Sequence, residues 1–251
     1  MRKNIVLYKL LFLIAVSSIL LFSVVYESGA MLDIYDFPIE PGTDEWKAFT
    51  THEEMVKACR IPTSVLRQLP TDGLIETVLT YPLINDVWAY NTPQQGISAV
   101  ISQFNGLQEL LIRHDSGARL LAKYASMDIE SMRKGLSDLE LIDYYHKVKI
   151  VEMVIAQQPI VSNLSTYQID DLVIQALAKG KQEQQEDVFS VSSGVRITAW
   201  LISRTLKQAN YEPFLETFNE DDDVRIFVST GFFYNNYDKL FELANCFTAN
   251  K

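Results

Sequence analysis

One short stretch of the chain combines residue types that could bind a catalytic metal. His52 is followed by Glu53, and a zinc peptidase helix of the His-Glu-x-x-His type needs a second histidine four residues after the first. Val56 stands at that position, and the other histidines, His114 and His146, are distant in the sequence. The spacing argues against this zinc site, and we expect no metal site, no cofactor and no catalytic residue of this kind.

The same residues form a good helix start. Thr51 and Glu54 have the spacing of a capping box, in which each side chain satisfies an exposed amide of the first turn. The same spacing recurs twice: Ser137 with Glu140, and Ser165 with Gln168. We therefore interpret the histidine-containing stretch as the beginning of a helix.

Other groups of reactive side chains are no better matched to a known chemistry. His114, Asp115 and Ser116 are adjacent, whereas a catalytic triad converges from separate elements. The acidic run at 219–225 lacks the glycine and the glutamate that a calcium loop needs at its sixth and twelfth positions. A pair of carboxylates, such as Glu152 with a second acid distant in sequence, stays open.

The overall charge is acidic. The 251 residues carry a formal net charge of −10, and residues 1–30 hold three basic residues and one acidic residue, which leaves −12 for the remainder. Nucleic acid and anionic lipid surfaces bind basic patches, so we expect neither as a partner.

The N-terminus has the pattern of an export signal. Arg2 and Lys3 precede an apolar run at 10–25, and small residues at 28–30 place a cleavage site before Met31. We expect a protein that is secreted or held in the cell envelope. The alternative is an uncleaved anchor, in which case residues 1–30 are the only part in the membrane.

The chain has two cysteines, Cys59 and Cys246. They could form one disulfide in an oxidising compartment, but two distant thiols are more often separate small core residues. We favour the second interpretation.

The spacing of apolar residues after position 31 is that of helices. Apolar side chains recur every three to four residues, with a long helix expected over 137–158, ended by Pro159, and another over 192–209. No sustained alternation predicts a strand. We predict an all-α fold, an array of packed helices. A weak similarity between 69–79 and 164–174 fits helix pairs of the α-solenoid kind.

A polar stretch divides the predicted body. Residues 179–187 are nearly free of apolar side chains, which indicates a solvated loop or a helix extension. We predict a signal segment at 1–30, a larger helical region at 31–178, a polar linker at 179–191 and a smaller helical region at 192–251. The two regions are expected to pack on each other.

Aromatic residues indicate one candidate binding surface. Tyr81, Trp88 and Tyr90 surround two prolines at predicted helix ends, where amphipathic rings often line grooves. The alternative, which we favour, is that Tyr81 and Trp88 fill the junction between helices.

The run from Pro41 to Tyr124 contains "PGTDEW", "HEEM", "IP", "YPL" and "FNGLQELL" in this order. In this respect the chain resembles a group of exported bacterial proteins. The resemblance implies bacterial origin and an all-helical exported protein. It supplies no activity, and therefore no functional residue.

We therefore expect an exported helical module that binds a protein or peptide without chemistry of its own. One alternative is a secreted hydrolase whose site is assembled only in three dimensions. Another is a structural envelope protein held by an uncleaved N-terminal helix.

Overall fold

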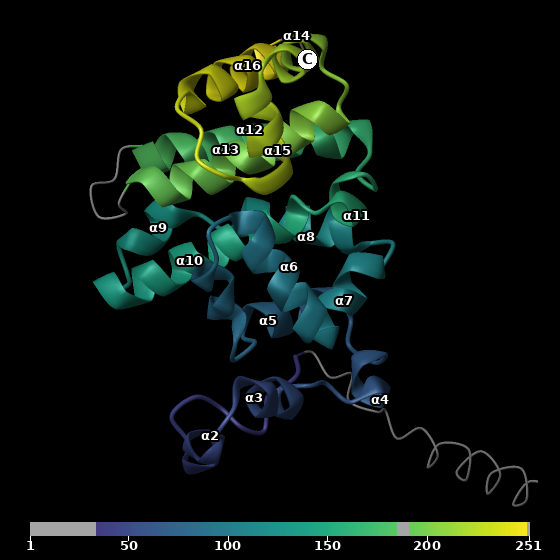
Figure 1. The fold of residues 1–251 in the computed structure, drawn as a ribbon, viewed down its shortest axis with the longest axis vertical. Helices are drawn as coiled ribbons and strands as arrows, with labels where there is room; N and C mark the ends of the chain where they lie inside the picture. Colours follow the sequence, from purple (N-terminus) through teal and green to yellow (C-terminus); the bar gives the residue numbers. More distant parts are fainter. Residues whose placement is uncertain (1–33, 185–190, 250–251) are drawn as a thin grey trace, which may run out of the picture. The chain divides into compact units, whose positions relative to one another are not determined.

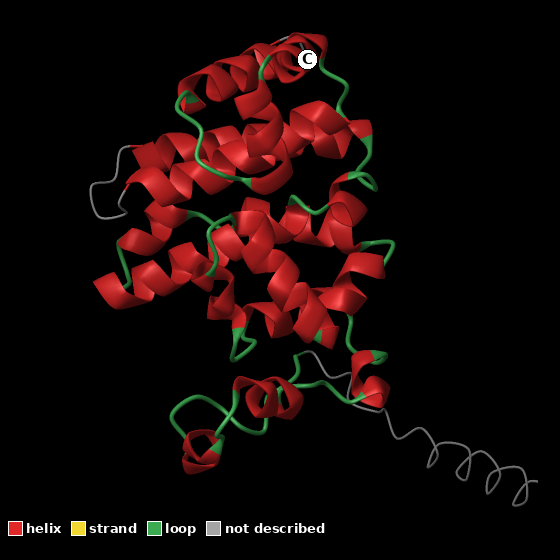
Figure 2. Cartoon of the chain, in the orientation of Figure 1, coloured by secondary structure: helices red, strands yellow, loops and turns green. Residues whose placement is uncertain are grey.

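The computed structural model describes residues 34–184 and 191–249. Residues 33–251 belong to one compact unit, and the described part of this unit consists of helices, turns and loops without a strand (Figure 1, Figure 2). The predicted all-α array of packed helices is confirmed. The predicted export segment lies outside the described residues.

The first half of the unit contains short and medium helices. They are α2 (Asp44–Ala48), α3 (His52–Ala58), α4 (Thr63–Leu66), α5 (Thr71–Leu79), the 3₁₀ helix η1 (Ile84–Ala89), α6 (Pro93–Gln103), α7 (Asn105–Ile112) and α8 (Ser116–Ser126).

The second half contains the longest helices. They are α9 (Ile129–Arg133), α10 (Asp138–Ile155), α11 (Gln158–Val161), α12 (Thr166–Gln184), α13 (Val191–Gln208), α14 (Glu212–Glu220), α15 (Asp222–Thr230) and α16 (Tyr237–Ala249). Within the described ranges, no helix has the length and apolar character needed to cross a lipid bilayer.

The helix starts read from the sequence are present in the structure. The Thr51 hydroxyl accepts a hydrogen bond from the Glu54 amide, and the Glu54 carboxylate accepts one from the Thr51 amide. The two other predicted boxes close as well, with the Glu140 carboxylate accepting from the Ser137 amide and the Gln168 side-chain oxygen accepting from the Ser165 amide. Because these hydrogen bonds join residues three positions apart, the helix starts can be predicted from the sequence.

Predicted helix ends are less accurate than predicted starts. The long helix α10 ends at Ile155, and Pro159 lies in the first turn of α11 rather than just after α10, so the prediction that Pro159 ends the long helix was wrong. A proline is accepted in a first turn because the amide it lacks has no partner there. The later helix expected over 192–209 is α13, displaced by one residue.

Helix α10 is the centre of the packing. It contacts α6, α8, α9, α11 and α13, and every residue from Val148 to Gln157 is buried. A helical segment that is buried on all sides is normally apolar all round, but this second half of α10 carries Lys149 and Glu152 inside the core. Those two charges require partners from neighbouring helices.

The predicted polar linker is partly helical. Helix α12 continues to Gln184, and Lys179 and Glu183 are buried within it, so the linker prediction differs from the structure over 179–184. Residues 185–190 lie outside the described residues. Helices α12 and α13 on either side of them pack extensively on each other, and both contact α16 (Figure 1).

The two cysteines are separate. Cys59 is buried, whereas Cys246 is exposed, and no disulfide joins them. Burial raises the pKa of the Cys59 thiol to about 11, so this thiol is inert at neutral pH.

Candidate binding site

The three aromatic residues singled out in the sequence occupy different environments. Tyr81 is only 2% exposed and stacks on Phe104, with ring centroids 3.9 Å apart. Trp88 is half-buried, with its ring 5.3 Å from that of His146. Tyr90 is 45% exposed. Tyr81 is therefore a core residue, and a binding role for the three stays a prediction that depends on Tyr90 and Trp88.

The polar motifs of the sequence are used for structure. The His52 Nε2 atom lies 2.7 Å from a carboxylate oxygen of Asp86, which joins α3 to η1. Asp115 accepts a hydrogen bond from the Thr71 hydroxyl, whereas the Ser116 hydroxyl donates to the carbonyl of Arg113 at the end of α7. The adjacent residues thus have different partners, as neighbours in sequence usually do.

A buried group of charged and polar side chains lies where α8, α10, α12 and α13 meet. We call it the Lys149 cluster: Tyr124, Lys149, Glu152, Glu183 and Thr198. Each of these side chains is at most 2% exposed. The sequence leaves the partner of Glu152 open, and in the structure Glu183, 31 positions further along the chain, shares Lys149 with it.

The cluster is fully hydrogen-bonded around one ammonium group. Lys149 Nζ donates to Glu152 over 2.8 Å, to the Thr198 hydroxyl over 2.7 Å, and to Glu183. The Tyr124 hydroxyl donates to the other Glu152 oxygen over 2.6 Å. The Thr198 hydroxyl also lies 3.0 Å from Glu152 and 3.1 Å from Glu183. Each helix contributes at least one member, so the cluster ties all four together.

The two carboxylates compete for that ammonium group. Burial, together with the nearby charge of Glu152, raises the pKa of Glu183 to about 7, although Lys149 opposes the shift. Burial by itself disfavours the charged form of Lys149, but the two carboxylates outweigh it and hold its pKa above the usual value. The acid and base groups are sealed from solvent, so a substrate has no access to them, and we assign the cluster a structural role.

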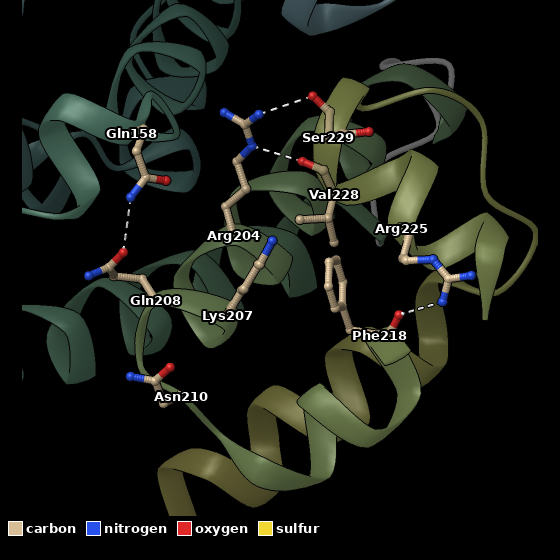
Figure 3. Close-up of a pocket in the computed structure, with 9 residues that line it drawn as sticks. All are labelled: Gln158, Arg204, Lys207, Gln208, Asn210, Phe218, Arg225, Val228 and Ser229. Atoms are coloured by element: carbon tan, nitrogen blue, oxygen red, sulfur yellow. Dashed lines mark hydrogen bonds between the residues drawn. The ribbon is translucent and has the colours of Figure 1, made fainter. Parts of the chain in front are cut away.

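A second group of polar side chains surrounds an open pocket of about 530 Å³ between α11, α13, α14 and α15 (Figure 3). This volume falls within the range of roughly 300–1,000 Å³ found for ligand sites. Three cationic residues line it: Arg204, Lys207 and Arg225. Three side-chain amides do as well: Gln158, Gln208 and Asn210. We call it the basic pocket.

The cations of the basic pocket stand at helix C-termini. Arg204 donates to the carbonyls of Val228 and Ser229 in the last turn of α15, and Arg225 donates to the Phe218 carbonyl near the end of α14 (Figure 3). The exposed carbonyls at a helix end carry partial negative charge, which cations stabilise. No aspartate or glutamate is among the described residues that line the pocket. It is a basic site on an acidic protein.

The pocket also has an apolar wall and a bridge across one edge. The Lys207 ammonium lies 4.1 Å from the centroid of the Phe218 ring. The Gln158 amide donates to the Gln208 side-chain oxygen over 3.2 Å and links α11 to α13. No sequence motif indicated this pocket, because its residues come from four helices and are brought together only by packing.

No family model, curated protein or solved structure matches the chain. The function therefore has to be argued from the geometry.

Replacing Lys149 by Met should destabilise the protein by about 3–5 kcal/mol, because two buried carboxylates lose their counter-charge. Urea unfolding followed by circular dichroism measures the change. The triple variant K149M/E152Q/E183Q removes the charges together and should be more stable than K149M alone. A triple variant that is less stable than K149M would contradict the counter-charge role of Lys149.

The stability should also depend on pH through Glu183. The pKa of Glu183 is about 7 in the folded protein, and 4.5 is taken for the solvated side chain of the unfolded chain. Between these two pH values the folded state therefore binds more protons than the unfolded state. The free energy of unfolding should then fall as pH rises from 5 to 8, by at most about 3 kcal/mol. Glu183→Gln cannot ionise and should remove this fall.

Urea unfolding of both proteins at pH 5, 6, 7 and 8 tests the prediction. Burial lowers the pKa of His146, so its titration makes the free energy of unfolding rise with pH near pH 6, in the wild type and in E183Q alike. The difference in unfolding free energy between the two proteins therefore reports on Glu183. A difference that stays constant over this range would show that Glu183 does not titrate there.

Proposed function

We propose that the protein is an exported, non-catalytic helical module that binds a protein or peptide in the basic pocket. The observation that carries the proposal is the contrast between the two polar groups. The pocket is open and lined by cations, amides and one aromatic ring, whereas the concentrated acid and base residues of the Lys149 cluster are sealed. Side chains of this kind suit recognition of a polar chain.

The composition of the pocket favours a peptide over an apolar ligand. Gln158, Gln208 and Asn210 each offer an amide that donates and accepts, which is the hydrogen-bonding pattern of a peptide group. Phe218 adds a flat surface for an aliphatic or aromatic side chain. The hydrolase alternative would require a substrate to reach Glu152 and Glu183, which are 0% and 2% exposed.

Export is part of the proposal, and it is supported by the N-terminal signal pattern alone. Cleavage before Met31 should give a mature chain that begins at this residue. Intact-mass measurement of the protein recovered from producing cells checks it. A chain that retains residues before Leu10 would instead support the envelope protein held by an uncut helix.

The binding proposal is tested by selecting a phage-displayed random peptide library on the purified full chain. Ser229→Trp should fill the pocket and reduce the affinity for the selected peptides at least about tenfold, which is a loss of roughly 1.4 kcal/mol in binding free energy. Ile226→Trp is the matched control, because Ile226 lies exposed on the same helix and does not line the pocket. Biolayer interferometry measures the affinities.

Two results would contradict the binding proposal. In the first, no peptide is enriched, or the enriched peptides bind the S229W and I226W variants equally. In the second, mass spectrometry shows that the wild-type protein cleaves the peptides and that E152Q does not, which would favour the hydrolase.

A further inference from the structure

We propose that the basic pocket holds a carboxylate of its peptide ligand, bound by the Lys207 ammonium and by the N–H groups of Arg204 that no carbonyl occupies. The inference rests on the proposed function and names the chemical group that the site recognises. Three observations carry it: the unused donors of Arg204, the position of Lys207, and the helix ends that surround the pocket.

Arg204 lines the pocket and retains hydrogen-bonding capacity (Figure 3). Its guanidinium has five N–H donors, of which Nε donates to Val228, Nη1 to Ala156 and Nη2 to Ser229, all at backbone carbonyls. Two donors, one on each terminal nitrogen, therefore have no hydrogen-bond partner among the described residues. Among the described residues no carboxylate forms an ion pair with this group.

Lys207 is a cation with no charged partner in the described structure. It follows Arg204 by three positions on α13, so the two side chains share a face of the helix. The Phe218 ring beside its ammonium attracts a cation but does not neutralise it. Arg225 differs, because it pairs with Asp222 and donates to the carbonyls of Phe218 and Asn219.

Arg204 and Lys207 are thus the cations whose charge an incoming anion can match. Burial lowers the pKa of Arg204 to about 10, and its carbonyl partners do not fully compensate for the lost hydration. A bound anion would offset the lost hydration of the guanidinium, which agrees with the carboxylate site that the geometry indicates.

The surrounding backbone favours a carboxylate over a phosphate. Phosphate sites are typically built on helix N-termini, where amide N–H groups and the positive end of the helix dipole face the ligand. Here the C-terminal ends of α13, α14 and α15 contribute to the wall, and their dipoles oppose a dianion more strongly than a monoanion. A carboxylate carries one negative charge and can accept hydrogen bonds from both Lys207 and Arg204, so it fits two cations surrounded by helix C-termini.

The test uses four pools of random hexapeptides, each captured through an N-terminal biotin. The C-terminus is either free or amidated, and the random positions either include or exclude Asp and Glu, which gives the four combinations. Only the amidated pool without Asp and Glu has no carboxylate. Binding of the full chain is measured by biolayer interferometry. The pools with a carboxylate should bind at least about tenfold more tightly than the pool without one. Comparing the two single-carboxylate pools shows whether the group is the chain terminus or a side chain.

Lys207→Gln should reduce binding of the carboxylate pools at least about tenfold and leave the neutral pool unchanged. Lys239→Gln is the control, because it removes the same charge from an exposed lysine that does not line the pocket. Arg204 is not substituted, since its three bonds to carbonyls hold α10, α13 and α15 together.

The outcomes separate this inference from the proposed function. If no pool binds, both fail. If the neutral pool binds as tightly as the others, or if K207Q and K239Q behave alike, peptide binding stands and the carboxylate assignment falls. Displacement by inorganic phosphate at lower concentration than by acetate would likewise overturn the assignment.

Discussion

The fold depends on how the buried ammonium of Lys149 is compensated. Lys149 lies in the buried second half of α10, so an uncompensated charge there would cost several kcal/mol. Glu152 supplies one counter-charge from the same helix, one turn away, and Glu183 supplies the second from α12. Thr198 adds the hydroxyl that reaches all three. Burial of the lysine therefore requires α12 and α13 to bring Glu183 and Thr198 to Lys149.

Helix α13 connects this cluster to the basic pocket. Thr198, in its first half, faces the cluster, and Arg204 and Lys207, in its last turns, face the pocket. Buried charges need partners, and the two sites meet this need differently. In the core the partners of Lys149 are carboxylates of the chain itself. At the pocket, Arg204 and Arg225 donate to backbone carbonyls of neighbouring helix ends, whereas the exposed Lys207 has the Phe218 ring beside it.

The sequence predicts best those features that depend on residues close together in the chain. The capping box of Thr51 and Glu54, and the start of α10 at Ser137, depend on residues three positions apart, so they could be read without a structure. Pro159 was misread because a proline can follow one helix or begin the next, and only the turn at Ala156 distinguishes the two cases. The polar composition of 179–184 predicts a solvated loop or a helix extension, yet Lys179 and Glu183 have polar or aromatic partners inside the core.

The acidic charge follows from composition alone. The all-helical class and the capped starts of α3, α10 and α12 follow from the order of residues, because spacing along the chain sets which side chains share a helix face and which can cap its first turn. The pairing of Glu152 with Glu183 and the composition of the basic pocket do not. Their residues are separated by tens of positions, and Lys149 or Lys207 alone looks like any surface lysine in the sequence. Contacts of this range arise only when helices pack, since burial and the approach of distant charges are properties of the assembled core.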